Sequence, residues 1–154
     1  MISKLLVIGY GNTLRKDDGV GPLAASELET LHLPGVNTLV CPLLTPELAE
    51  PVSRSDEVIF IDASVEPARD VQLRRVAPAD SSRVLAHAAN PQILLALARD
   101  VFGRVPKAWC LTIPVEDLGL GESLSATARA NLRSAVEMVV QMRAGRLDAD
   151  EDAR

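Results

Sequence analysis

The chain has 154 residues and a hydrophobic content of 47%, enough to bury the core of one domain and too much for a disordered chain. Its 16 basic and 21 acidic residues give a net charge of −5, which argues against a nucleic-acid binder and against docking on anionic lipid. Aromatic residues make up 3% of the chain, too few for a base-stacking platform. We therefore expect neither nucleic acid nor a membrane among its partners.

The N-terminus and the two cysteines predict a cytoplasmic protein. Only about four consecutive apolar residues precede Gly9, too few for a signal-peptide core or a membrane span. Cys41 and Cys110 lie far apart in apolar runs, which is typical of buried thiols in a reducing compartment. The absence of a CxxC motif and of a Cys/His cluster gives no support to a structural zinc site. We expect the chain to be a monomer.

Apolar runs alternate with helical patterns along the chain. Strands are predicted, in chain order, at residues 5–8, 36–41, 58–62, 71–76 (at an edge) and 109–113. Helices are predicted over 20–31, from Thr45 as far as about Pro51, over 91–102 after the cap Asn90, and after Ser123 or Ser125. This alternation predicts a single three-layer α/β domain over residues 1–145, with a mostly parallel sheet of about five strands covered by helices on both faces. The charged residues 146–154 are expected to form a frayed tail.

The segment 9–21, GYGNTLRKDDGVG, joins the first predicted strand to the first helix. A dinucleotide-binding motif needs glycine where Leu14 stands, and the Gly-Lys-Ser/Thr sequence of a P-loop is absent. Asp17 and Asp18 would repel a phosphate here, by roughly 4 kcal/mol for charges about 4 Å apart at a dielectric near 20. Both acids also suit the start of a helix, so a purely capping role stays open. Since one acid suffices for capping, Asp18 is the better functional candidate.

Three side chains that can bind a metal follow predicted strands: Asp18, Asp62 and His87. In such sheets ligands bind beyond the carboxyl ends of the strands, so we expect these side chains to converge. Two carboxylates and one imidazole suit a divalent ion such as Ni²⁺, Zn²⁺ or Mn²⁺. The structural alternatives are a loop cap for Asp62 and a partly buried, satisfied side chain for His87. The protease and esterase motifs HExxH and GxSxG are absent.

The segment 9–21 is close to a complete match to the first motif of the maturation endopeptidases of nickel–iron hydrogenases, Gly-x-Gly-Asn-x-Leu-x-x-Asp-Asp/Glu-Gly-x-Gly. With Ile61-Asp62-Ala63 and His87, the chain resembles this family over roughly residues 3–143. The segment 45–49 also resembles a family segment, with Leu43 in place of a glutamine often found before it. The resemblance implies a sheet between helices and an enzyme that cuts a short C-terminal extension from the precursor of the hydrogenase large subunit after nickel insertion. It also implies that Asp18, Asp62 and His87 contact the metal.

The chain offers no plausible serine or cysteine nucleophile. We therefore expect Asp18, Asp62 and His87 to be the catalytic and metal-binding residues, which complete the coordination of a nickel ion carried by the substrate and leave the site empty in the free protein. An affinity difference of about 2.7 kcal/mol would give nickel-loaded precursor a 100-fold preference. Whether the ion or a carboxylate such as Asp18 activates water stays open. Two alternatives remain: a metallohydrolase with its own tightly held metal, and a non-catalytic module that binds nickel or a nucleotide.

Overall fold

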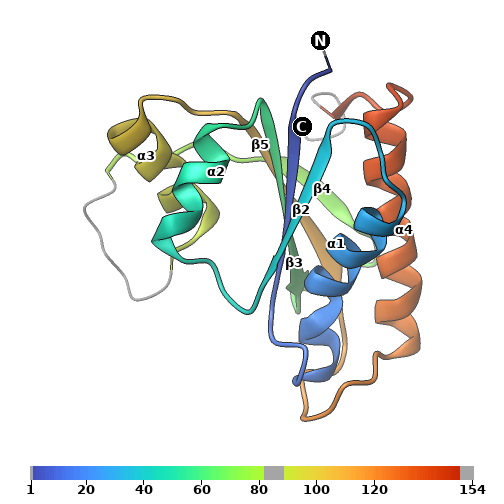
Figure 1. Ribbon diagram of the computed structural model, residues 1–154. Coiled ribbons are helices and arrows are strands. Elements are labelled where there is room, and N and C mark those ends of the chain that lie inside the picture. The colour runs from blue at the N-terminus through green and yellow to red at the C-terminus, as the bar shows by residue number, and fades with distance from the viewer. Residues whose placement is uncertain (1, 82–88, 150–154) are drawn as a thin grey trace.

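The computed structural model describes residues 2–81 and 89–149 (Figure 1). The elements in chain order are β1 (Leu5–Tyr10), α1 (Val20–Thr30), β2 (Val36–Cys41), α2 (Ala49–Ser53), β3 (Glu57–Ser64), β4 (Gln72–Arg75), α3 (Pro91–Phe102), β5 (Lys107–Pro114) and α4 (Ala126–Arg143). The short 3-10 turns η1 (Lys16–Gly19) and η2 (Pro46–Leu48) precede α1 and α2. Every strand and helix predicted from the sequence is present.

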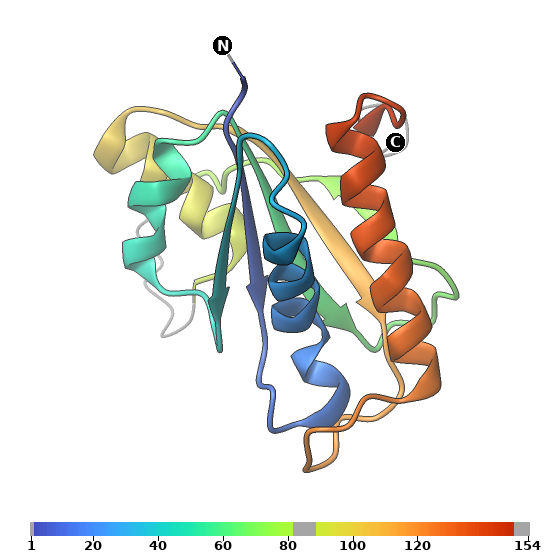
Figure 2. The ribbon, with the colours of Figure 1, turned by 45° about the vertical axis from the view of Figure 1, so that its right-hand side comes forward.

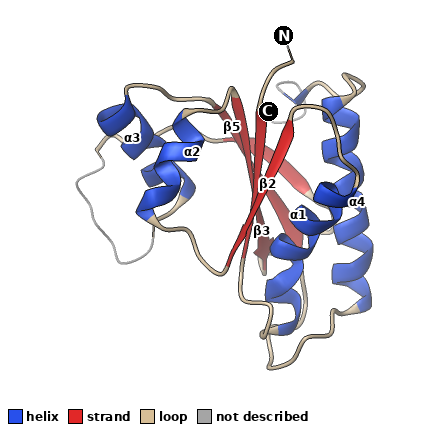
Figure 3. Ribbon diagram, viewed as in Figure 1, coloured by secondary structure: helices blue, strands red, loops and turns tan. Residues whose placement is uncertain are grey.

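The five strands form one sheet in the order β2-β1-β3-β5-β4. The first four of these are parallel, and β4 pairs antiparallel with β5 at the edge. Helices α1 and α4 cover one face of the sheet, while α2 and α3 cover the other (Figures 2 and 3). The structure therefore confirms the predicted three-layer α/β domain and the edge position of the fourth strand.

Alternating side chains along the central strands build two apolar layers. Leu6 and Ile8 of β1 and Phe60 of β3 face α2 and α3, where Leu94 and Leu95 are fully buried. The side chains between them join the layer beneath α1 and α4: Val7, Ile59, Ile61, Trp109 and Leu111. Because β1 and β3 are covered on both faces, their sequences are apolar almost without interruption.

Local capping explains where α3 and α4 begin. The side-chain oxygen of Asn90 accepts a hydrogen bond from the Ile93 amide (2.8 Å), and Gly103 ends α3 with a left-handed φ of 71°. Ser125, and not Ser123, caps α4, because its hydroxyl oxygen accepts the Ala128 amide (3.1 Å). Thr45 makes no such side-chain bond; it precedes η2, and α2 follows as a single short turn.

The C-terminal segment differs from the expected tail at its beginning. The Arg146 amide donates to the Gln141 carbonyl (2.9 Å), Leu147 packs against the core beneath α1 and α4, and Ala149 is only 7% exposed. The domain therefore extends past residue 145, because Leu147 and Ala149 contact the core. The many charged residues around them in the sequence had suggested a solvent-exposed segment. Residues 150–154 lie outside the described residues, so for them a frayed tail stays a prediction. No helix in the described ranges is long and apolar enough to cross a bilayer.

Candidate functional site

Two glycines let the first helix sit directly on the ends of the central strands. A side chain at Gly9 would collide with the backbone carbonyl oxygen of Gly21, and a Cβ at Gly21 would lie 2.6 Å from the carbonyl oxygen of Ile61. Only hydrogen fits in such spaces, so the spacing of these glycines in the motif is a packing requirement. The close approach brings η1 into contact with β3. The structure thus brings two of the predicted site segments together.

Asp62 lies near the carboxyl end of β3 and is half-buried. The Tyr10 hydroxyl donates a hydrogen bond to its Oδ2 (3.2 Å). Burial raises the pKa of Asp62 to about 6, although hydrogen bonds from Tyr10 and from the Ala63 amide favour the ionised form; repulsion from the Asp18 carboxylate raises this pKa further. A carboxylate with so little compensation for its burial is a candidate for binding a cation or for moving a proton.

Asp18 lies in η1 and is also half-buried. Its Oδ2 accepts a hydrogen bond from the Asn12 amide (2.7 Å), and the side-chain oxygen of Asn12 accepts the Leu14 amide (2.9 Å). The asparagine of the motif therefore shapes the loop that holds Asp18. Because η1, which carries Asp18, contacts β3, and the charge of Asp18 adds to the effect of burial on the pKa of Asp62, the two carboxylates form a pair whose repulsion a divalent cation would offset. We call Asp18 and Asp62 the carboxylate pair.

Asp17 has different surroundings and is fully buried. It accepts four hydrogen bonds: from the amides of Glu116 (3.0 Å), Asp117 (2.9 Å) and Ser125 (2.7 Å), and from the Ser125 hydroxyl (2.7 Å). Burial alone would raise the pKa of Asp17, but these hydrogen bonds outweigh it and hold the pKa below its usual value. Asp17 thus anchors η1 to the loop between β5 and α4.

The structure corrects the capping role that the sequence left open for Asp17 and Asp18. Helix α1 begins at Val20 with Gly19 at its N-cap, and no side chain caps it. The two acids instead lie in the preceding turn. Lys16 strengthens the attachment of this turn to the loop between β5 and α4. The Lys16 amide donates to the Gly121 carbonyl (2.8 Å), and the Lys16 Nζ pairs with Asp117 (2.9 Å).

The third predicted site residue, His87, lies outside the described residues and stays a prediction. Within residues 2–81 and 89–149, no group of three or more His, Cys, Asp and Glu side chains is arranged to hold a metal ion. Asp18 and Asp62, two of the three ligands predicted from the sequence, lie within the described residues, and their role as metal ligands stays a prediction.

Sequence reasoning missed Tyr10 and did not connect either cysteine with the site. Burial, followed by the charge of Asp62, raises the pKa of Tyr10 well above its usual value, so Tyr10 acts as a hydrogen-bond donor. Burial raises the pKa of Cys110 to about 12, with a further contribution from Asp62, and burial also raises the pKa of Cys41. Both cysteines are half-buried thiols. A signal for Tyr10 was present: it lies two residues after Ile8, and therefore on the same face of a strand next to β3.

Together, the fold and the carboxylate pair define a class: an α/β domain with acidic side chains at the carboxyl ends of a mostly parallel sheet. A scan against protein-family models and a search of curated proteins gave no match. Among solved structures, this is the fold of the NiFe hydrogenase maturation proteases. The hydrogenase maturating endopeptidase HybD of E. coli is 24% identical, with a TM-score of 0.68 over 92% of this chain and 94% of that one.

Two further structures agree. The NiFe hydrogenase maturation protease HycI of Thermococcus kodakarensis is 19% identical, with a TM-score of 0.70 over 92% of this chain and 93% of its own. An endopeptidase from Escherichia coli is 22% identical, with a TM-score of 0.72 over 94% and 95% of the two chains. The fold expected from the motif resemblance is therefore confirmed across nearly the full length of the chain.

Proposed function

We propose that this chain is an endopeptidase that removes the C-terminal extension from the precursor of a nickel–iron hydrogenase large subunit after nickel has been inserted. The observation that carries the proposal is the carboxylate pair, because its two members come from the motif segment and from the strand end that the family resemblance singles out. The full-length likeness in fold to hydrogenase maturation proteases supports it. We propose further that the chain acts in the cytoplasm as a monomer.

In this proposal the nickel ion belongs to the substrate, and Asp18, Asp62 and His87 complete its coordination. The carboxylates supply hard oxygen ligands, and a neutral His87 supplies a nitrogen ligand. The hydrogen bond from Tyr10 orients Asp62 as an outer-shell partner. A precursor that carries nickel relieves the repulsion between the two carboxylates, whereas a precursor without nickel does not. The ion thereby distinguishes a hydrogenase precursor that has received its nickel from one that has not.

A cleavage assay followed by mass spectrometry tests this proposal. The wild-type protein is mixed with a large-subunit precursor from the same source, once with nickel inserted and once without. We expect a defined C-terminal peptide to be released only from the nickel-loaded sample. Cleavage of both samples would remove nickel as the signal and keep the peptidase, whereas cleavage of neither, with a competent precursor, would contradict the proposed function.

Variants and metal analysis assign the site. Asp18→Asn and His87→Ala are expected to lose cleavage. Asp70→Asn makes the same charge change as Asp18→Asn at an exposed position and is expected to keep it. Cleavage at the wild-type rate by both site variants would contradict the assignment. Stoichiometric, tightly held metal in the purified protein would instead favour a metallohydrolase with its own ion.

A further inference from the structure

Within the described residues no strand pairs with the outer edge of β2, and the carboxyl end of β2 lies at the same end of the sheet as Asp62, with β1 between β2 and β3. Strand β2 is terminal in the sheet and pairs with β1. The Gly35 carbonyl accepts the Leu5 amide (2.9 Å) and the Cys41 carbonyl accepts the Gly11 amide (3.1 Å). Because successive residues of a strand direct their backbone groups to opposite sides, those of residues 38 and 40 point away from β1. The hydrogen bond from the Gly11 amide to the Cys41 carbonyl also connects the end of β2 to the motif loop, residues 9–21.

This edge lacks the features that block the pairing of a further strand. The sequence of β2, VNTLVC, contains neither a charge nor a proline, and Val40 is 49% exposed. The opposite edge, β4, has only four residues, two of which are Arg74 and Arg75. Proteins protect exposed edges with short strands, charges or prolines. The β4 edge is protected in this way, whereas the β2 edge is open to an extended peptide.

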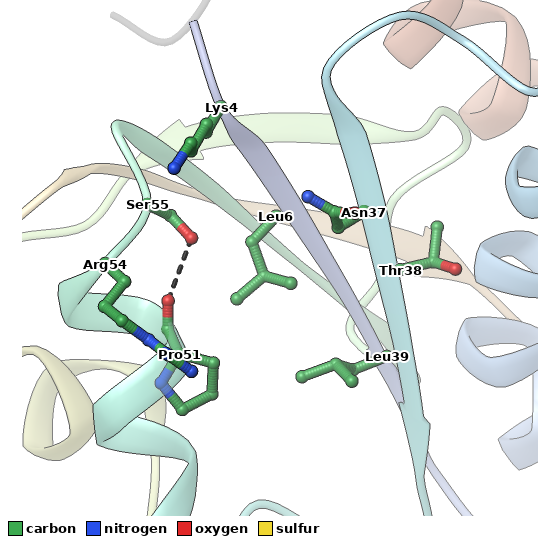
Figure 4. A pocket seen from close by; sticks show the side chains of 8 residues that line it. All are labelled: Lys4, Leu6, Asn37, Thr38, Leu39, Pro51, Arg54 and Ser55. Atoms are coloured by element: carbon green, nitrogen blue, oxygen red, sulfur yellow. Dashed lines mark hydrogen bonds between the residues drawn. The ribbon is translucent and has the colours of Figure 1, made fainter.

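A cavity lies beside the amino half of this edge, between β2 and α2 (Figure 4). It has a volume of about 340 Å³ and is lined by Asn37, Thr38 and Leu39 of β2 and by the cationic residues Lys4 and Arg54. The cavity therefore offers positive charge to a ligand that follows the edge.

Two acidic residues, Glu50 and Asp56, lie near these cations, and neither holds one of them in a buried ion pair. Arg54 pairs with Glu50 at 3.5 Å, but both side chains are more than half exposed, so the pair is weak. Asp56, whose charge interacts with Lys4, is paired with Arg104 at 2.7 Å. A carboxylate entering the cavity would therefore meet two cations that are not held by buried partners.

The carboxyl end of β2, at the end of the sheet where Asp62 lies, has a different character. Val40 and Leu43 are about half exposed there. From Cys41 back to Asn37 the strand covers roughly 13 Å, the length of about four extended residues. A peptide lying on this edge would thus meet apolar side chains at the carboxyl end of β2 and cations toward its amino end.

We propose that the C-terminal extension of the precursor binds along the β2 edge as an added antiparallel strand, with its terminal carboxylate held by Lys4 and Arg54. This inference rests on the proposed function. The direction follows from the geometry: if the bond that is cut lies at the carboxylate pair, the C-terminus must lie toward the amino end of β2. Backbone hydrogen bonds to residues 38 and 40 supply affinity that depends little on sequence, as in other cases of strand addition.

A proline scan of the edge tests this proposal. Thr38→Pro removes an outward-pointing N–H and leaves the bonds to β1 intact, whereas the matched control Thr38→Ala keeps that N–H. With nickel-loaded precursor, we expect the KM of Thr38→Pro to be about tenfold higher than that of Thr38→Ala, at unchanged kcat. The double variant Lys4→Gln/Arg54→Gln should raise KM and abolish any preference for a free over an amidated C-terminus. Circular dichroism verifies that each variant folds.

A second measurement uses the unmodified protein and does not depend on cleavage. Hydrogen exchange is recorded with and without an excess of the synthetic extension peptide, and we expect protection of the amides of residues 38 and 40. If wild type cleaves the precursor but Thr38→Pro equals Thr38→Ala and the peptide gives no protection, the edge proposal fails and the proposed function stands. If wild type neither cleaves nor shows protection, both fail. If Thr38→Pro changes only the oligomeric state, the edge joins two copies of this chain and the proposal is wrong.

Discussion

Asp17 and Asp62 are two carboxylates withdrawn from water in neighbouring parts of the molecule, with opposite consequences for their pKa values. Asp17 accepts four hydrogen bonds, and its pKa lies below the usual value. Asp62 accepts fewer, has Asp18 beside it, and its pKa rises to about 6. The number of donors and the neighbouring charge, not burial alone, decide which carboxylate is a structural anchor and which has a pKa raised above its usual value.

The largest expected effect concerns the anchor. Asp17→Asn replaces a charge that four donors stabilise and turns an NH₂ group toward amide donors. We expect a loss of roughly 3–5 kcal/mol in the free energy of unfolding, measured by urea denaturation. Asp70→Asn is the matched control and should change this free energy by less than about 0.5 kcal/mol. A similarly small loss for Asp17→Asn would show that the anchor contributes little.

The same substitution at Asp62 should have the opposite sign. Asp62→Asn removes a half-buried charge and its repulsion with Asp18, so we expect the metal-free protein to gain roughly 2 kcal/mol of stability at about pH 8. Urea denaturation alongside wild type measures the difference. A loss comparable to that of Asp17→Asn would contradict the distinction between the two carboxylates.

The pH dependence of stability separates the two groups. Because the pKa of Asp62 is higher in the folded than in the unfolded chain, its contribution is fully present below the unfolded value and is lost as the pH rises through about 6. Because the pKa of Asp17 is lowered by folding, its contribution is present above the unfolded value and is lost as the pH falls through the folded one. The difference between the unfolding free energies of metal-free wild type and Asp62→Asn, measured from about pH 3 to about pH 8, should change mainly between about pH 4 and 6 and stay constant above that range. Parallel curves would refute the raised pKa.

The smallest effect concerns Tyr10. Tyr10→Phe removes the hydroxyl donor to Asp62 and keeps the ring, so the pKa of Asp62 should rise further while stability changes by about 1 kcal/mol. A carboxyl-carbon NMR titration of Asp62 in both proteins measures the pKa directly. An unchanged or lower pKa would mean that this hydrogen bond does not hold the ionised carboxylate.

The sequence predicted what depends on local patterns and on general rules of parallel sheets. The unbroken apolar run of β3 predicted a strand covered on both faces, and the position of Asp62 near its end predicted a meeting with Asp18. The partners of Asp17 could not be predicted, because they lie about a hundred residues away and only the tertiary packing brings them close. The burial of Ala149 could not be predicted for a similar reason, since charged neighbours in the sequence favour an exposed segment and only the tertiary packing brings Ala149 to the core.

The central claim is that the carboxylate pair is the functional site, and the cleavage rate of Asp62→Asn tests it most directly. The release of the C-terminal peptide from nickel-loaded precursor is followed with wild type, Asp62→Asn and the control Asp70→Asn, each verified as folded. We predict that Asp62→Asn cleaves at least about 100-fold more slowly than wild type while being at least as stable, and that Asp70→Asn matches wild type. Cleavage by Asp62→Asn at the wild-type rate would contradict the account.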